Sequence, residues 1–180
     1  MIQEIKRVQC EILPVYAVVM NEIFLRTMSN LACQIINEVP TSLPDKATER
    51  GVRNLLMILC RNMEDVAPRN ASIKAVEVAA RLGIEDLRRL HFDDGGRIPG
   101  GRAASRLHWE HWFPVAEMRR ELMDLQKPTP EGCRKVLEKA RLCWILKEED
   151  DALTSLGYRS RRPDPEAAYR EAGIEMAYPW

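Results

Sequence analysis

The chain has 180 residues, of which 46% are hydrophobic and 30% are charged, and its 27 basic residues balance its 27 acidic ones. This composition supports a sizeable buried core and differs from that of a disordered chain. The zero net charge argues against both a strongly basic nucleic-acid binder and an acidic mimic of DNA. The most apolar run, residues 12–20, is too short for a bilayer span or a signal peptide, so we expect no membrane contact.

The five cysteines are odd in number and contain no Cys-x-x-Cys pair. This pattern favours neither a disulfide framework nor a zinc knuckle. We expect them to be small buried residues in a reducing compartment, which predicts a cytoplasmic protein. The cysteines are Cys10, Cys33, Cys60, Cys133 and Cys143.

Apolar residues recur at helical spacing in the N-terminal half, and no alternating, strand-like run interrupts them. After a first long helix opened or kinked by Pro14, a second helix is expected to begin near Ser42 or Asp45 and to end before Pro68. A third helix begins near Asn70 or Ser72 and stops at Gly83. A short helical segment over 85–92 completes this half.

Residues 93–104 form a glycine- and arginine-rich loop or hinge between an N-terminal half, 1–92, and a C-terminal half, 105–180. In the second half we predict a short helix from Ser105 through Trp112. A helix capped by Thr129, with Pro130 in its first turn, is predicted to extend to Trp144. The last helix starts at 164–165 and ends at 173. The predicted fold class is all-α: an irregular multi-helix bundle with one shared core, or two helical lobes joined by the loop.

The three histidines, His91, His108 and His111, fall within 21 residues. On a helix, His108 and His111 would lie on one side and share a divalent metal ion with His91 or with Asp93 from the loop. The competing interpretation is that these histidines bond to backbone carbonyls while the neighbouring tryptophans fill the core. No cofactor is therefore predicted, and one divalent ion is the alternative.

The segment Glu110-His111-Trp112-Phe113-Pro114 resembles the first block of the HNH (His-Me finger) nucleases. The resemblance implies that His111 is a general base beside Glu110 in a metal-dependent nuclease or phosphoesterase. The chain departs from the family pattern afterwards, because it has no asparagine after Asn70 and no histidine after His111. A catalytic role for these two residues is thus an alternative.

Residues 75–90 resemble a helix-turn-helix, with Ala79 as the small residue and Gly83 in the turn. This resemblance implies a DNA-binding regulator in which Arg88 and Arg89 lie on the groove-facing helix. The turn is about two residues shorter than the usual pattern, so two ordinary packed helices explain the same residues.

The C-terminal block, residues 143–150, 161–165 and 168–174, resembles uncharacterised proteins of bacterial mobile elements and phages. The resemblance implies a small non-enzymatic protein that binds a protein partner, as an inhibitor or anti-defence (anti-CRISPR-like) factor. The chain also has 20 arginines against 7 lysines, and arginine and tryptophan commonly anchor interfaces. Self-association through the aromatic C-terminus is a further expectation. The predicted partner-binding residues are Arg97, Arg102, Trp109, Trp112, Arg159, Arg161, Arg162 and Trp180.

Overall fold

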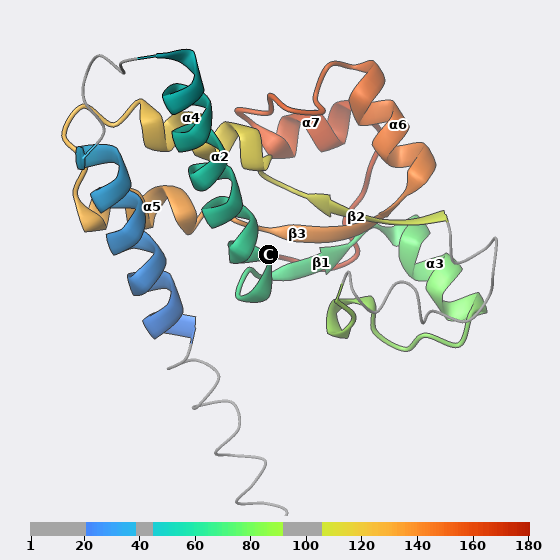
Figure 1. Ribbon diagram of the computed structural model, residues 1–180. Helices are drawn as coiled ribbons and strands as arrows, with labels where there is room; N and C mark the ends of the chain where they lie inside the picture. Colours follow the sequence, from blue (N-terminus) through green and yellow to red (C-terminus); the bar gives the residue numbers. More distant parts are fainter. Residues whose placement is uncertain (1–20, 39–44, 92–105) are drawn as a thin grey trace, which may run out of the picture.

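The computed structural model describes residues 21–38, 45–91 and 106–180, and it shows an α/β fold (Figure 1). The prediction of an all-α fold is wrong, because a three-stranded mixed sheet lies among the helices. The helices are 21–38, α2 (Lys46–Asn62), α3 (Ile73–Arg81), α4 (Val115–Met123), α5 (Pro130–Leu137), α6 (Lys147–Ser155) and α7 (Pro165–Glu171), with short 3₁₀ turns η1 (Met63–Asp65) and η2 (Leu87–Arg89).

Several helix starts agree with the capping residues that the sequence predicts. Asp45 accepts hydrogen bonds from the backbone of Ala47 and Thr48, at 2.7 and 2.8 Å, and starts α2. Ser72 caps α3, and Thr129 caps α5. These side chains satisfy amide groups that have no partner in the first helical turn.

The sheet consists of β1 (Arg69–Ala71), β2 (Leu107–His111) and β3 (Leu142–Leu146), in the order β1-β3-β2. β1 runs parallel to β3, whereas β2 runs antiparallel to it. Two predicted helices are therefore wrong. The segment that ends at Trp112 forms β2, and the helix expected to reach Trp144 stops at Leu137 and is followed by β3.

β3 escapes a search for alternating residues because all five of its residues, Leu-Cys-Trp-Ile-Leu, are buried. A central strand covered on both faces is a continuous apolar run, and it is too short to be distinguished from part of a helix by its periodicity. β1 has only three residues and carries no periodic signal at all.

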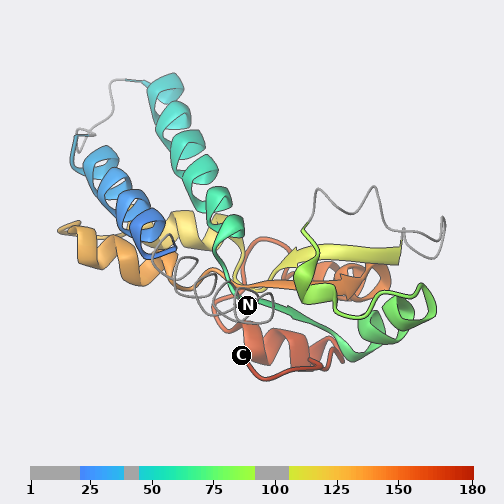
Figure 2. The same ribbon diagram turned by 90° about the horizontal axis from the view of Figure 1, so that it is seen from below.

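The two faces of β3 belong to two different hydrophobic clusters. Leu142, Trp144 and Leu146 join a large cluster with α2, α3, α4 and α5. Cys143 and Ile145 join a smaller cluster with Leu153 of α6 and Tyr169 of α7, among others. Figures 1 and 2 show the corresponding layers: α6 and α7 cover one face of the sheet, and helix 21–38, α2, α4 and α5 gather at one end.

Strands from both predicted halves of the chain meet in this sheet, since β1 precedes the 93–104 segment and pairs with β3. That segment lies outside the described residues. The four described cysteines are all buried and free, as predicted for them, whereas Cys10 lies outside the described residues. Among the described residues, no helix has the length and apolar character needed to cross a bilayer.

Leu55 and Leu56 offer a test of which face of α2 holds the core. Leu56 is fully buried, whereas Leu55 is 55% exposed. We predict that Leu56→Ala lowers the free energy of unfolding by about 2–5 kcal/mol, because it leaves a cavity. Leu55→Ala should change it by less than about 0.5 kcal/mol. Urea denaturation of both variants measures this, and equal losses would contradict the assignment of Leu56 to the core face of α2 and Leu55 to the exposed face.

Candidate functional site

β2 separates the histidines that the sequence places together. Side chains alternate along a strand, so His108 and His111, which are three residues apart, lie on opposite faces of the sheet. His108 and Glu110 share the face toward α6. In the pairing of β2 with β3, His108 lies beside Ile145 and Glu110 lies beside Cys143. His111 shares the other face with Trp109.

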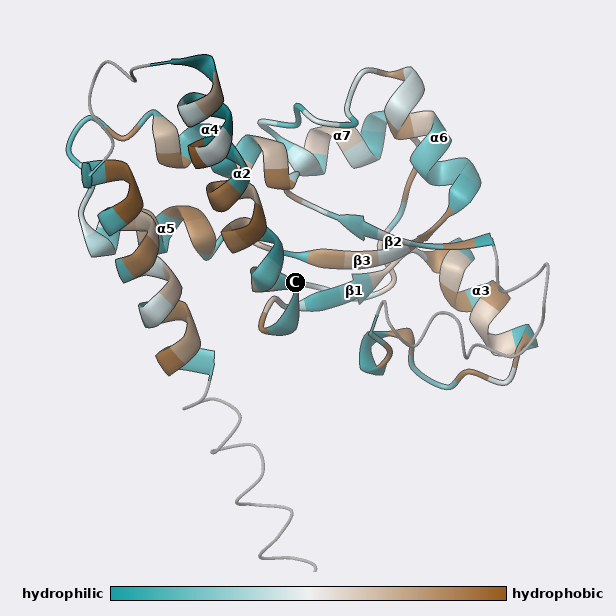
Figure 3. Ribbon diagram, viewed as in Figure 1, coloured by the Kyte–Doolittle hydropathy of each residue, from teal (hydrophilic) through white to brown (hydrophobic). Residues whose placement is uncertain are grey.

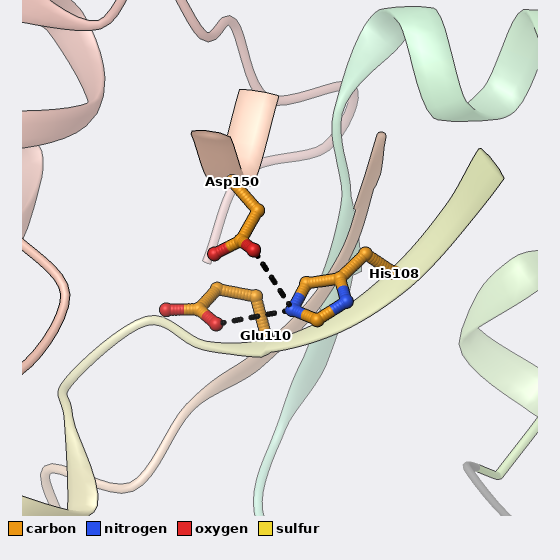
Figure 4. A group of neighbouring side chains, drawn as sticks. All are labelled: His108, Glu110 and Asp150. Carbon is orange, nitrogen blue, oxygen red and sulfur yellow. Dashed lines mark ion pairs between the residues drawn. The ribbon is translucent and has the colours of Figure 1, made fainter. Parts of the chain in front are cut away.

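The α6 face of β2 carries a compact polar cluster formed by His108, Glu110 and Asp150 (Figure 4). His108 Nε2 lies 3.6 Å from Glu110 Oε2 and 3.6 Å from Asp150 Oδ2. Asp150 belongs to the first turn of α6, which follows β3 directly. The carboxylates are mostly buried, and the histidine is 35% exposed. β2 and α6 thus bring together three side chains, of residue types that can bind metal ions or transfer protons.

Each carboxylate of this cluster also has a cationic partner. The Arg162 guanidinium donates to Glu110 Oε1 at 2.9 Å, and the Lys147 ammonium lies 2.6 Å from Asp150 Oδ2. Hydrogen bonds to Asp150 and Asp151 raise the pKa of Lys147 above its ordinary value. Both carboxylates of the cluster therefore already have a cationic partner inside the protein, and Lys147 shares its charge with Asp151.

No cysteine near this cluster is an activated nucleophile. Cys143 of β3 is paired with Glu110 of β2, its sulfur lies 2.9 Å from the Tyr169 hydroxyl, and burial raises the pKa of its thiol far above the ordinary value. Burial likewise raises the pKa of Cys60 to about 12. Thiols held neutral in this way are poor nucleophiles and metal ligands.

The opposite face of β2 holds a second polar group, in which Glu64 of η1 is the shared acceptor. His111 Nε2 lies 3.0 Å from Glu64 Oε1, and the Trp109 indole donates to Glu64 Oε2 at 3.2 Å. His91 Nε2 is 3.5 Å from Asp65, and its ring centroid is 5.7 Å from that of Trp109. The structure therefore brings His91 and His111 to the neighbourhood of Trp109, and it places His108 elsewhere.

The HNH-like segment and the helix-turn-helix-like segment both differ from the arrangement that the resemblances imply. Glu110 and His111 are consecutive, so they point to opposite faces of β2. The expected second helix of the helix-turn-helix is only the three-residue 3₁₀ turn η2. Within it, Arg88 pairs with Asp86 and stacks on Tyr178, whereas Arg89 is 85% exposed.

The predicted partner-binding residues divide into exposed and buried ones. Arg159, Arg161 and Trp180 are exposed. Trp109 and Arg162 are buried, and Trp112 packs against Tyr169 and Trp180. Asp93, Arg97 and Arg102 lie outside the described residues.

A groove of about 740 Å³ at the helical end of the molecule was not predicted. It lies between residues 21–26, the turn that follows α2, and the C-terminal end of α5. Three arginines and two glutamates line it together with apolar side chains. The apolar lining includes Ile23, Leu25, Met63, Val66, Leu137 and Ala140.

Comparisons with known proteins add no relative. No protein-family model matches the chain, and neither the curated proteins nor the solved structures contain a match. The groove and the polar cluster are therefore the features that bear on function.

Arg162 is the buried side chain whose removal should cost most. It is fully buried and donates to the backbone carbonyls of His111, Trp112 and Tyr158 as well as to Glu110. We predict that Arg162→Ala lowers the free energy of unfolding by about 3–5 kcal/mol, because a buried carboxylate and three carbonyls lose their donor.

The exposed neighbour Arg161 is the matched control for this measurement. Arg161→Ala should stay within about 0.5 kcal/mol of the wild type. Chemical denaturation of both variants decides the point. A comparable loss in each would mean that the internal contacts of Arg162 do not matter.

Glu64 predicts an acid-sensitive contribution to stability. Burial raises the pKa of Glu64, but hydrogen bonds from His111 and Trp109 and nearby positive charge outweigh it, so the net pKa is lowered. Ionised Glu64 therefore stabilises the fold above its unfolded pKa of about 4.3, and this contribution disappears as the pH falls through the lower folded pKa. In thermal melts from neutral to acid pH, Glu64→Gln should lose stability less steeply than the wild type below about pH 4.3. Parallel curves would contradict this assignment.

Proposed function

We propose that this protein acts by binding another protein, and that the groove of about 740 Å³ receives an amphipathic, acidic helix of that partner. The observation that carries the proposal is a groove between helices that is lined by apolar side chains together with three arginines and two glutamates. This arrangement is typical of the recognition mode in which a helix lays its apolar face into a hydrophobic groove.

Exposed apolar residues also lie outside the groove, on helix 21–38 and on α2. Ile23, which lines the groove, is 41% exposed, and Leu31 on the same helix is 45% exposed. On α2, Leu55 and Ile58 are 55% and 58% exposed and lie three residues apart, on one side of the helix. Figure 3 shows hydrophobic residues along both helices. Side chains of this size on neighbouring helices favour an interface over a site for a small polar ligand.

The charged side chains that line the groove predict the charge of the partner's helix. Glu22 and Glu138 are both held by Arg134, which donates to Glu22 Oε2 at 2.8 Å and to Glu138 Oε1 at 2.8 Å. Although Arg26 attracts Glu22 electrostatically and Arg141 donates to the backbone carbonyls of Glu138 and Ala140, neither arginine forms an ion pair within 4.0 Å of a carboxylate among the described residues. They remain to pair with carboxylates on the bound helix, since complementary rim charges accelerate association and select partners.

The resemblance of the C-terminal block to mobile-element and phage proteins favours a host or defence protein as this partner. Inhibition of that protein would follow if the occupied helix were part of its working surface. Arg159, Arg161 and Trp180 are exposed and remain proposed contacts outside the groove.

Site-specific photo-crosslinking in the native host tests the proposal. A photo-reactive benzoyl-phenylalanine in place of Ile23 should give one dominant protein adduct, and Arg26→Glu in the same chain should reduce its yield several-fold by repelling an acidic helix. Mass spectrometry of the adduct identifies the partner and the crosslinked segment.

Two matched controls make the result specific. Leu156, the C-cap residue of α6, is exposed to a similar degree, 43%, and lies outside the groove, so the same probe there should give no such adduct. Arg170→Glu changes an exposed arginine that is not a proposed contact, and it should leave the yield at position 23 unchanged. Equal adducts at 23 and 156, an adduct only with a second copy of this chain, or a yield unaffected by Arg26→Glu would refute the proposed occupant.

A further inference from the structure

The structure points to a second site, independent of the groove: we infer that His108, Glu110 and Asp150 form a binding site for one divalent transition-metal ion between β2 and α6. Their ligand atoms all lie within 4.8 Å of one another (Figure 4). Among the described residues, these three side chains are the group whose possible ligand atoms lie this close together.

The spacing of the donors is close to that of a coordination sphere. Metal–ligand bonds of about 2.0–2.2 Å with angles of about 90–110° place neighbouring donor atoms ~2.9–3.5 Å apart. His108 Nε2 is already 3.6 Å from Glu110 Oε2 and from Asp150 Oδ2. The distance from the histidine to each carboxylate is therefore close to that in a coordination sphere, and all three donor atoms lie within 4.8 Å of one another.

Arg162 holds Glu110 in the orientation that the site needs. Its guanidinium donates to Glu110 Oε1, and Oε2 faces His108. Because Arg162 is fully buried and is fixed by three backbone carbonyls, the carboxylate has little freedom to turn away. Partners of this kind orient ligands in metal sites and tune their affinity.

One nitrogen and two carboxylate oxygens select the class of ion. Imidazole together with carboxylate suits Zn²⁺, Co²⁺ or Mn²⁺, whereas Mg²⁺ and Ca²⁺ prefer oxygen ligands alone. The three side chains occupy one side of the ion, and the histidine is 35% exposed. The remaining positions are left for water or for an anionic ligand.

Lys147 acts as a built-in competitor of the metal. Its ammonium bonds to Asp150 Oδ2, the same oxygen that faces His108, and to Asp151 Oδ1 at 2.8 Å. The lysine side chain is 51% exposed, so it is free to swing into solvent when an ion arrives. Metal binding must displace this ammonium, and removing it should tighten binding.

Titration with Co²⁺ tests the inference, because bound Co²⁺ has a visible absorption spectrum that requires no enzymatic activity. We expect one equivalent to bind wild-type protein, His108→Ala to weaken binding by at least about tenfold, and Lys147→Met to strengthen it. His111→Gln is the matched control, since His111 lies on the opposite face of β2 and pairs with Glu64. It should leave the spectrum and the affinity unchanged.

Circular dichroism of each variant confirms that it is folded, and calorimetry with Zn²⁺ provides a second readout. If neither the wild type nor Lys147→Met binds Co²⁺ below about 1 mM, the inference is overturned. Binding that survives His108→Ala, or that falls equally in His111→Gln, overturns it as well. Binding seen only in Lys147→Met and abolished by His108→Ala supports both the site and the competition.

Discussion

The burial of β3 on both faces is the constraint from which the rest of the structure follows. All five of its residues are buried, so each face of the sheet must be covered, and polar groups buried beside the strand are stabilised where they find partners inside the fold. Glu149 illustrates the consequence: its Oε2 accepts from the backbone of Leu146, at the end of β3, and from the Ser72 hydroxyl that caps α3. One buried carboxylate thereby connects the starts of two helices to the central strand.

Arg162 serves the same purpose at the other end of the strand pair. β2 ends at His111, and the carbonyls of His111 and Trp112 accept from the guanidinium. Without this donor, the carbonyls would be buried unpaired beside Glu110. The arginine that resembles an interface anchor in the sequence is therefore an internal cross-link between the end of β2 and the 158–162 segment. The orientation of Glu110, and with it the shape of the polar cluster, depends on that cross-link.

The sequence predicted those features that depend on neighbours along the chain. Thr129 was identifiable as a cap, and Asp45 and Ser72 were identifiable as residues near helix starts, because a cap acts within its own first turn. The sheet was missed because its pairing is long-range: Arg69 faces Leu142, and Leu107 faces Leu146. Asp150 belongs to the acidic run 148–151, and no local pattern in the sequence shows that β3 brings α6 against His108. The groove depends on three separated segments and was invisible for the same reason.

The alternation of β2 also explains why the chain can carry two unrelated polar groups on five residues. Odd positions place Trp109 and His111 against Glu64, in the layer that continues into α2. Even positions place His108 and Glu110 against α6. The buried side chains of β3 separate the polar cluster on the α6 face from the helical end of the molecule, where the groove lies. An ion bound at the cluster would therefore alter the groove only by moving the sheet itself, and a close-packed sheet of this kind resists such movement. The two sites should thus act independently.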